Sequence, residues 1–330
     1  MWLLLRAEAS PDGILEALRK LSVPAHLRQL GERWAIEVHA NGHLPEALLR
    51  YEEVERVLTE KVPYPLVASW DGQIELSDWR RGKALLWIAG PCSVESRRQL
   101  LDLATVLRDV GVHVLRGGAF KARTSPYSFQ GEGQAALEWL LEARALTGLP
   151  LCVEVVSESH LELYESIDVL QIGARNMDDY WLLKAVGATH KPVLLKRNPQ
   201  ATIEEWLLAA EYLLLHGAPW VLLTERGIRT FERTLRYTLD VGAIPVVQER
   251  TRLPVIADPS HAAGQWRYVH ALGLAAVGVG AEGLIVEVHN DPLQARSDAA
   301  QQLTIEQFAA LYAQANALFE ARSRHLSQPI

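Results

Sequence analysis

The chain is poor in cysteine and has no long hydrophobic run. These two absences argue against a disulfide-stabilised protein and against a membrane-spanning protein. Of its 330 residues only two are cysteine, Cys92 and Cys152, and Cys152 lies inside an apolar strand-like stretch. A disulfide framework is therefore excluded, and a reducing compartment is expected. The longest apolar runs, such as residues 220–223, are too short to cross a bilayer, and residues 1–6 lack the features of a signal peptide. We expect a cytoplasmic protein with no membrane partner.

An excess of positive charge is also lacking. The formal net charge is −7, so neither nucleic acid nor an anionic membrane is expected as the main partner. Low-complexity stretches and short repeats are absent, which argues against a disordered chain. What is present is a composition of 49% hydrophobic and 22% charged residues. That is sufficient for a sizeable core in one large domain and one small domain.

The first 62 residues alternate between strand and helix patterns. Large apolar side chains occur at every second position over residues 34–38, which is typical of a strand, and they follow helical spacing over residues 12–21. The predicted elements are strand 2–7, helix 12–21, strand 24–30, strand 33–39, helix 44–51 and strand 53–60. This βαββαβ order is ferredoxin-like. Residues 63–83, with two prolines and an Asp-Gly turn, are predicted to be a linker and hairpin.

From residue 84 onward, short apolar strand patterns alternate with amphipathic helical stretches. Eight strand cores are predicted, at residues 85–89, 112–115, 151–155, 169–172, 193–195, 220–223, 255–257 and 284–286. Eight parallel strands that are apolar throughout, because both faces are covered, match a (β/α)₈ barrel over residues 84–330. A doubly wound open sheet is the alternative. The predicted fold class is α/β, a TIM barrel with a small N-terminal ferredoxin-like α+β domain.

Each predicted barrel strand is followed by a charged residue or by a type of residue that binds metals. In a barrel these strand ends converge on the face that carries the active site. One such charge is an ordinary consequence of a strand meeting solvent, but eight together favour a functional mouth. In strand order they are Cys92; Arg116 and Lys121; Glu154; Arg175; Lys196; Glu225 and Arg226; Asp258 and His261; Glu287 and Asp298.

Four of these residues form a mixed sulfur, nitrogen and oxygen donor set. Cys92, His261, Glu287 and Asp298 are predicted to bind one divalent metal ion, a first-row ion rather than calcium or magnesium. Sequence does not distinguish Mn, Fe, Co and Zn. Simpler roles remain open, namely a small buried residue for Cys92, a loop histidine for His261 and a helix N-cap for Asp298. Glu287 ends an apolar run, where an unpaired carboxylate is costly to bury, so a cation partner is favoured.

The cations at the same strand ends indicate a multiply anionic ligand. Guanidinium and ammonium groups are what phosphate and carboxylate oxygens require. Simpler interpretations exist for single positions: Arg175 closing a turn, Lys196 as surface charge, and Arg226 paired with Glu225 or Glu249. The whole set is Arg116, Lys121, Arg123, Arg175, Lys196 and Arg226.

Seven segments within residues 84–330 resemble 3-deoxy-D-arabino-heptulosonate 7-phosphate (DAHP) synthase and occur in the family's order. They are GPCSVE (90–95), LRGGAFKARTSPYSFQG (115–131), QIGARNM (171–177), KPVLLKR (191–197), ERGIRTFE (225–232), DPSHAAG (258–264) and GLIVEVHND (283–291). The chain resembles the microbial subclass that is related to 3-deoxy-D-manno-octulosonate 8-phosphate synthase and has a ferredoxin-like domain before the barrel. Residues 121–124 read Lys-Ala-Arg-Thr where the family usually has Lys-Pro-Arg-Thr. No asparagine is inserted there as in the octulosonate enzymes, which favours the heptulosonate activity.

The resemblance implies a metal-dependent, aldol-type condensation of phosphoenolpyruvate with erythrose 4-phosphate and water. The products are DAHP and phosphate, in the first step of the shikimate pathway to aromatic amino acids. By motif position, the residues implied for phosphoenolpyruvate are Arg116, Lys121, Arg175, Lys196, Arg226 and the backbone of Ala174, and those for erythrose 4-phosphate are Arg123 and Thr124. The implied metal ligands are the four named above.

Acid and base roles are predicted from strand-end position. Lys121 and His261 are alternatives for protonating the new alkoxide, and Glu154 is predicted to orient the attacking water. Asp258 is included in the catalytic set because it follows the same strand as His261.

Residues 1–62 carry a separate expectation. In this family such a domain mediates feedback inhibition by an aromatic amino acid, here tyrosine or phenylalanine, and a homotetramer is expected. An oligomerisation or stability module is the alternative for these residues. For the whole chain, two other hypotheses remain: an octulosonate 8-phosphate synthase that uses arabinose 5-phosphate, and a phosphosugar-binding barrel without activity.

Overall fold

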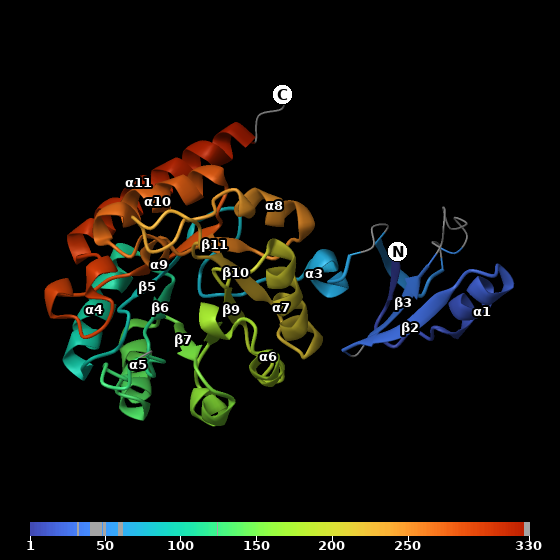
Figure 1. The fold of residues 1–330 in the computed structure, drawn as a ribbon, viewed down its shortest axis with the longest axis horizontal. Coiled ribbons are helices and arrows are strands. Elements are labelled where there is room, and N and C mark those ends of the chain that lie inside the picture. The colour runs from blue at the N-terminus through green and yellow to red at the C-terminus, as the bar shows by residue number, and fades with distance from the viewer. Residues whose placement is uncertain (32, 40–47, 49–50, 59–61, 124, 327–330) are drawn as a thin grey trace.

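An eight-stranded barrel and a separate four-stranded sheet make up the computed structural model, which describes residues 1–31, 33–39, 48, 51–58, 62–123 and 125–326 (Figure 1). The barrel strands are β5 (Leu86–Gly90), β6 (Val114–Arg116), β7 (Leu151–Val155), β8 (Val169–Ile172), β9 (Val193–Lys196), β10 (Val221–Glu225), β11 (Val255–Ala257) and β12 (Gly283–Glu287). Every neighbouring pair is parallel, and β12 pairs with β5 to close the ring. Each predicted strand core overlaps one of these strands, so the predicted TIM barrel is confirmed.

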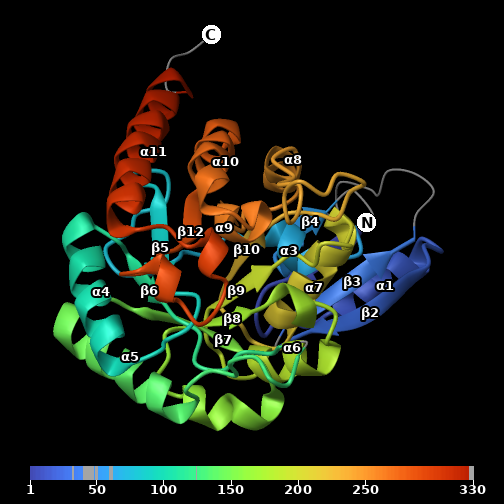
Figure 2. The ribbon, with the colours of Figure 1, turned by 60° about the vertical axis from the view of Figure 1, so that its left-hand side comes forward.

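Helices surround the barrel and cover the outer faces of its strands (Figure 2). The α-helices are α4 (Arg97–Val110), α5 (Gln134–Thr147), α6 (Tyr180–Gly187), α7 (Ile203–Leu215), α8 (Ala243–Arg250), α9 (Pro259–Ala263), α10 (Trp266–Val279) and α11 (Ile305–Leu326). Short 3₁₀ turns occur at η1 (Glu158–Tyr164), η2 (Ala174–Asn176), η3 (Pro292–Gln294) and η4 (Ala299–Gln301). Local sequence sets several boundaries: Ser96 caps α4 by accepting from the N–H of Gln99, and Thr202 with Glu205 forms a capping box on α7.

The segment before β5 closes the barrel at the end opposite the strand carboxyl termini. Residues 62–83 contain α3 (Pro65–Ser69) and no paired strands, so the predicted hairpin is not formed. Instead, Leu76 and Trp79 are buried against the inward-facing side chains of the barrel. Trp79 donates its indole N–H to the carbonyl of Ala84 at 2.7 Å. This segment was predicted to pair as a hairpin. Its observed role is to bury two large apolar side chains in the barrel interior.

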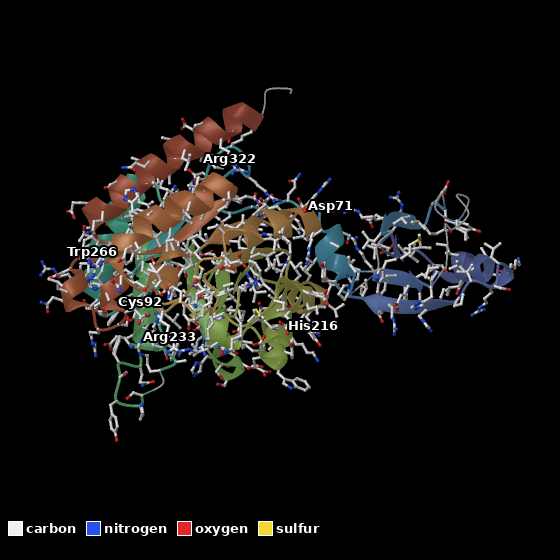
Figure 3. The ribbon with its side chains drawn as sticks, turned by 45° about the horizontal axis from the view of Figure 1, so that its top comes forward. Asp71, Cys92, His216, Arg233, Trp266 and Arg322 are labelled. Atoms are coloured by element: carbon white, nitrogen blue, oxygen red, sulfur yellow. The ribbon has the colours of Figure 1, made fainter. Side chains whose placement is uncertain are left out.

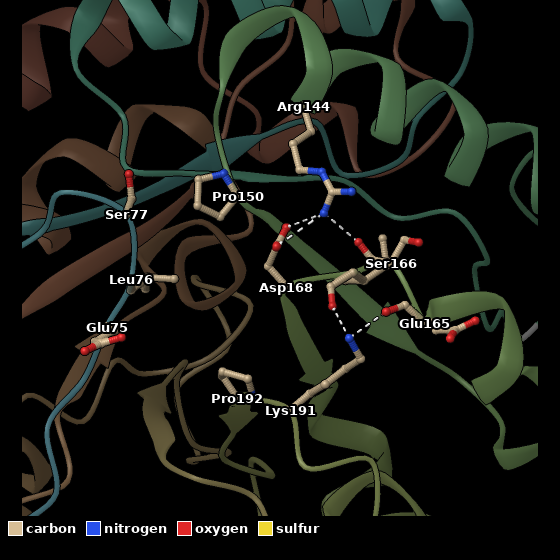
Figure 4. Close-up of a pocket in the computed structure, with 11 residues that line it drawn as sticks. Glu75, Leu76, Ser77, Arg144, Pro150, Glu165, Ser166, Asp168, Lys191 and Pro192 are labelled. Atoms are coloured by element: carbon tan, nitrogen blue, oxygen red, sulfur yellow. Dashed lines mark hydrogen bonds and ion pairs between the residues drawn. The ribbon is translucent and has the colours of Figure 1, made fainter.

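A surface pocket adjoins the same segment, as Figure 4 shows. Its two cations already have partners within the protein. Lys191 donates to the carbonyls of Glu165 and Ile167, and Arg144 contacts Asp168. This pocket therefore offers no free cation to an anionic ligand.

The N-terminal sheet consists of β1 (Trp2–Leu5), β2 (Ala25–Leu30), β3 (Arg33–Val38) and β4 (Val54–Leu58), in the order β2-β3-β1-β4. All pairs are antiparallel, and α1 (Asp12–Lys20) packs on one face. This order is that of a ferredoxin-like sheet, as predicted. The predicted helix 44–51 lies almost wholly outside the described residues.

The connection between the two parts is made by α3, which packs against α7 (Figure 1). Glu211 on α7 accepts hydrogen bonds from the backbone N–H groups of Leu66 and Val67, at 2.9 and 2.8 Å. A carboxylate thus satisfies two of the N–H groups that the first turn of a helix leaves without partners. Across the parts that the structure describes, no helix is long and apolar enough to cross a membrane.

Candidate functional site

The carboxyl ends of the barrel strands bring Cys92, Glu287 and Asp298 into one cluster, and the fourth predicted metal ligand, His261, lies beside Glu287. Cys92 Sγ lies 3.6 Å from Asp298 Oδ2, and His261 Nε2 lies 3.4 Å from Glu287 Oε1. Ligand atoms of Cys92, Glu287 and Asp298 all lie within 4.8 Å of one another. Figure 3 places Cys92 in the barrel, away from the N-terminal sheet. Residues separated by more than 200 positions therefore share one cluster.

Cys92 is positioned by a close approach of two strands. Gly90 ends β5 with a φ of +154°, and a Cβ there would lie 2.0 Å from the carbonyl oxygen of Arg116 on β6. Only glycine fits this position. Beyond it, the backbone N–H of Cys92 donates to Gln302 Oε1 at 3.1 Å, which ties the β5 loop to the segment after η4.

Glu287 and Asp298 are held by different means. The backbone N–H of Glu287 donates to Ser260 Oγ at 3.0 Å, and its side-chain Oε2 accepts from Gln301 Nε2 at 2.6 Å. Asp298 has a φ of +43° and precedes η4. Its side chain makes no capping hydrogen bond to that turn, so the N-cap alternative for Asp298 is not realised.

Burial and charge make this cluster suited to a cation. Cys92 is fully buried, and burial together with the charges of Glu287 and Asp298 raises the pKa of its thiol to about 12, against the opposing effect of Lys121 and Arg116. A cation among the donors reverses that balance and favours the thiolate. Lys121 Nζ lies 3.3 Å from Cys92 Sγ and donates to the Cys92 carbonyl at 3.1 Å. The chemistry of the donors fits a first-row divalent ion.

Two buried carboxylates are held ionised by their neighbours. Burial alone would raise the pKa of Glu287, but His261 and Arg116, whose Nη1 lies 2.7 Å from Oε1, hold it well below its usual range. Burial opposes the ionisation of Asp258 in the same way, but His261 and Lys196 lower its pKa. Asp258 Oδ2 lies 2.6 Å from Lys196 Nζ and 2.7 Å from His261 Nδ1. Asp258 therefore connects Lys196, a cation of the barrel mouth, to His261, a candidate metal ligand.

Arg226 is a buried cation with unused hydrogen-bonding capacity. It is buried, and its Nε and Nη1 atoms have no hydrogen-bond partner within the described parts of the chain. Its guanidinium packs over the ring of Tyr237, 4.3 Å from the ring centre. Arg175 differs, since it is exposed and donates to the carbonyl of Ala122 at 2.6 Å. Buried donors without partners indicate a place for anionic oxygens.

A cavity adjoins the cluster and is lined by most of the predicted site. The predicted residues on its wall are Lys121, Arg123, Glu154, Ala174, Arg175, Lys196, Arg226, His261 and Asp298. Cys92, Arg116, Asp258 and Glu287 are buried behind that wall. Thr124 lies outside the described residues. Glu154 needs Gly173 beside it, because a Cβ at that glycine would lie 1.9 Å from Glu154 Oε1.

Three residues of the site have no counterpart in the sequence prediction. Gln171 and Arg236 line the cavity, and Gln301, the last residue of η4, donates a hydrogen bond to Glu287. Arg236 Nη1 lies 3.6 Å from Asp298 Oδ2 and donates to Gln301 Oε1 at 3.0 Å. Arg236 follows β10 by eleven positions in an irregular loop, so strand-end position gives no signal for it.

The simpler interpretations of the neighbouring arginines are also corrected. Arg197, next to Lys196, is buried and contacts Glu225 and Asp240, each at 2.9 Å. Lys196 is itself buried, so it is not surface charge. Glu225 contacts Arg197, so the alternative pairing of Glu225 with Arg226 is not formed.

Fold and site together define a TIM barrel with a partly buried set of candidate metal ligands beside a cation-lined cavity. Residues 75–323 match the DAHP synthetase I family, and the chain therefore belongs to that family. A relative named phospho-2-dehydro-3-deoxyheptonate aldolase, from Thermotoga maritima, is 46% identical over 282 residues, covering 84% of this chain and 82% of the relative. A 2-dehydro-3-deoxyphosphooctonate aldolase from a Bradyrhizobium species is 33% identical over 245 residues, covering 68% of this chain and 84% of the relative.

Solved structures support the same assignment. The crystal structure of the Thermotoga maritima phospho-2-dehydro-3-deoxyheptonate aldolase (DAHP synthase) superposes with a TM-score of 0.78 at 39% identity, covering 98% of both chains. A truncated form of 3-deoxy-D-arabino-heptulosonate 7-phosphate synthase from the same organism gives a TM-score of 0.71 at 43% identity, covering 77% of this chain and 94% of that one. The resemblance seen in the seven motifs is confirmed.

Proposed function

We propose that this enzyme condenses phosphoenolpyruvate with erythrose 4-phosphate and water, giving DAHP and phosphate. The observation that carries the proposal is the cluster of a thiol, an imidazole and two carboxylates beside a cavity lined with cations. Membership of the DAHP synthetase I family and a relative named for the heptonate reaction support the same substrates.

Phosphoenolpyruvate carries a phosphate and a carboxylate and therefore needs several cations. Arg226 supplies buried N–H groups that have no other partner in the described structure, and Arg116 keeps a free Nε beyond its contact with Glu287. Lys196 and Arg175 lie on the same wall, and Ala174 begins the adjacent turn η2. Paired hydrogen bonds from such groups hold phosphate and carboxylate oxygens firmly.

Erythrose 4-phosphate is proposed to bind at the rim of the cavity. Arg123 Nη1 lies 3.8 Å from Asp298 Oδ1, so its guanidinium stands beside the metal cluster and faces the cavity. Arg236 approaches the other oxygen of Asp298 from the opposite side. A phosphate held at this rim leaves the aldehyde end of the sugar directed towards the cluster.

The proposed metal ligands are Cys92, His261, Glu287 and Asp298. When bound there, a divalent ion supplies Lewis-acid polarisation of the aldehyde oxygen. Burial alone would lower the pKa of Lys121, but nearby Cys92 and the carboxylates raise it, so its ammonium form is available as a proton donor. Lys121 is favoured over His261 for protonating the new alkoxide, because both ring nitrogens of His261 face carboxylates.

Two further roles follow from position. Glu154 lines the cavity and is proposed to orient the water that attacks C2 of phosphoenolpyruvate. Asp258 holds His261 and Lys196 in place, so we assign it positioning rather than proton transfer.

Lys121→Met is expected to lower kcat by roughly 10²- to 10⁴-fold. Near-normal turnover by that variant would remove Lys121 as the acid.

The test is phosphate release from phosphoenolpyruvate with erythrose 4-phosphate or arabinose 5-phosphate, before and after treatment with a chelator. We expect turnover with erythrose 4-phosphate, loss of it on chelation and recovery with added divalent ions. Preference for arabinose 5-phosphate would instead support octulosonate synthesis, and no turnover with either sugar would support a binding barrel.

A pair of thiol variants makes the metal assignment specific. Cys92→Ser is expected to reduce both bound metal and turnover. Cys152→Ser is the matched control, because Cys152 is equally buried but faces the apolar barrel interior. Equal metal content in the two variants would refute the role of Cys92.

A further inference from the structure

A second group of metal-binding side chains lies on the N-terminal sheet, outside the barrel site. His26 on β2 is directly opposite Glu37 on β3 in the antiparallel register. His39 follows Glu37 by two positions, and its backbone N–H donates to the carbonyl of Pro24 at 2.9 Å, which continues the ladder. Since successive side chains point to opposite faces of a strand, all three side chains share one face.

The donor atoms of the three side chains converge. His26 Nδ1 lies 3.1 Å from His39 Nε2, and His39 Nε2 lies 3.4 Å from Glu37 Oε1. One ligand atom from each of the three residues lies within 4.8 Å of the others. Ligands at about 2.0–2.1 Å from a tetrahedral zinc ion are separated from each other by about 3.3 Å. The two shorter separations match that value without any movement.

Hydrogen bonding alone leaves this arrangement incompletely satisfied. One imidazole nitrogen offers either one N–H or one lone pair, so His39 Nε2 makes a full hydrogen bond to only one of its two close neighbours. A cation at the centre accepts lone pairs from both histidines and from the carboxylate at once. Nitrogen and oxygen donors of this kind suit zinc and neighbouring first-row ions.

The surrounding structure orients the donors. The β2–β3 ladder runs through six residue pairs, and the two imidazole rings meet edge to face with centres 5.0 Å apart. Arg28 Nη2 lies 3.3 Å from Glu37 Oε2, which leaves Oε1 directed to His39. A partner on the second carboxylate oxygen is a common way of fixing a ligand's orientation.

We propose that His26, Glu37 and His39 form a zinc-class metal site that joins the edge strand β2 to β3. The protein supplies three ligands, so a further coordination position is open to water, and His26 is exposed. The site is independent of the proposed reaction in the barrel. Zinc bound here stabilises the folded sheet, because it binds the folded state in preference to the unfolded one.

The first experiment counts zinc bound per chain after dialysis of the full-length protein against limiting Zn²⁺. The variants are the double substitution His26→Asn with His39→Asn, and the control His270→Asn, whose side chain contacts Gln314 on the barrel. Each is prepared with Cys92 intact and with Cys92→Ser, which separates this site from the barrel cluster. We expect the double variant to hold one zinc ion fewer in both backgrounds, and His270→Asn to match its parent.

A second readout locates the ion. Zn²⁺ is expected to slow backbone amide exchange across β2 and β3 in the parent, and to have no such effect in the double variant. Equal zinc content and equal exchange in parent and double variant would overturn the proposal. If the double variant fails to fold, the single exposed change His26→Asn decides instead: loss of one zinc ion supports the site, and retention refutes it.

Discussion

At the scale of single residues, Arg226 and Arg197 differ in whether the protein itself satisfies their buried donors. Both are buried arginines at the ends of neighbouring strands, β10 and β9. Arg197 contacts Glu225 and Asp240, whereas Arg226 keeps two nitrogen atoms without hydrogen-bond partners among the described residues. Leaving a buried donor unsatisfied costs about 1–3 kcal/mol. This free-energy cost is recovered when the oxygen atoms of a bound ligand accept hydrogen bonds from these N–H groups.

Arg226→Met is therefore expected to weaken phosphoenolpyruvate binding without unfolding the protein. The KM for phosphoenolpyruvate should rise at least about tenfold, because charge-assisted hydrogen bonds contribute about 1.5–3 kcal/mol each. The free energy of unfolding should stay within about 1 kcal/mol of wild type, since the gain from removing unsatisfied donors offsets the lost contact with Tyr237. Steady-state kinetics and urea denaturation measure the two effects.

Arg197→Met is the matched control. It leaves Glu225 buried with its charge partner removed, and breaking such a pair costs about 3–5 kcal/mol. If Arg226→Met were destabilised as strongly as Arg197→Met, Arg226 would be a structural residue rather than a binding residue.

Strand-end position predicted most residues of the site but not their pairing. It pointed to Cys92, Glu287 and Asp298, whose ligand atoms lie close together, and to His261, which lies beside Glu287, because each of the four follows a barrel strand. It missed Arg236, because that side chain reaches the cavity from an irregular loop. Which arginine is free and which is paired depends on the distances between loops, and local sequence patterns do not determine those distances.

At the scale of elements, the junction of β5 and β6 depends on one glycine. Gly90→Ala is expected to destabilise the fold by at least about 3 kcal/mol, because the new Cβ would meet the Arg116 carbonyl at 2.0 Å in a left-handed backbone conformation. Gly278 in α10 is the control, since a Cβ there meets nothing within 4 Å. Gly278→Ala should be neutral or stabilising by up to about 1 kcal/mol. Equal effects in denaturant unfolding would contradict this account of Gly90.

The contact between α7 and α3 predicts a pH dependence of stability. Burial raises the pKa of Glu211 to about 7 from an ordinary value of 4.5, although the N–H groups of Leu66 and Val67 oppose the shift. The folded state therefore binds more protons than the unfolded state between these values. Stability contributed by this group is fully present below pH 4.5 and is lost as the pH rises through 7.

Glu211→Gln removes this titration. Between pH 5 and pH 8, the wild type is expected to lose roughly 1–3 kcal/mol of unfolding free energy relative to the variant. Urea denaturation at several pH values measures the difference. Parallel pH profiles of wild type and variant would show that Glu211 does not titrate in this range.

At the scale of the whole molecule, the structure separates a removable part from an essential one. The described residues between Met1 and Val57 form their own core, whereas Leu76 and Trp79 complete the barrel interior. Deleting residues 1–62 is expected to leave a folded enzyme with its turnover intact. Deleting residues 1–80 should abolish cooperative unfolding, because loss of two buried large side chains costs several kcal/mol, about 2–5 each.

The shorter deletion also tests regulation by the N-terminal domain. We propose that tyrosine or phenylalanine inhibits the full chain through residues 1–62, and we expect the truncated chain to be insensitive to both. Activity assays with each amino acid decide the matter. Unchanged inhibition of the truncated enzyme would exclude the domain as the receptor.

By itself, the sequence determined the order and kind of the elements. Apolar runs buried on both faces indicate a parallel sheet that is covered on both sides, and alternation at every second residue indicates a sheet with one covered face, because hydrophobic burial depends on local periodicity. Tertiary structure alone decided which side chains meet across the barrel mouth, that Leu76 and Trp79 fill the barrel where a hairpin was predicted, and that two histidines and a glutamate converge on the N-terminal sheet. Those outcomes depend on register, loop path and packing between distant segments, which no local pattern encodes.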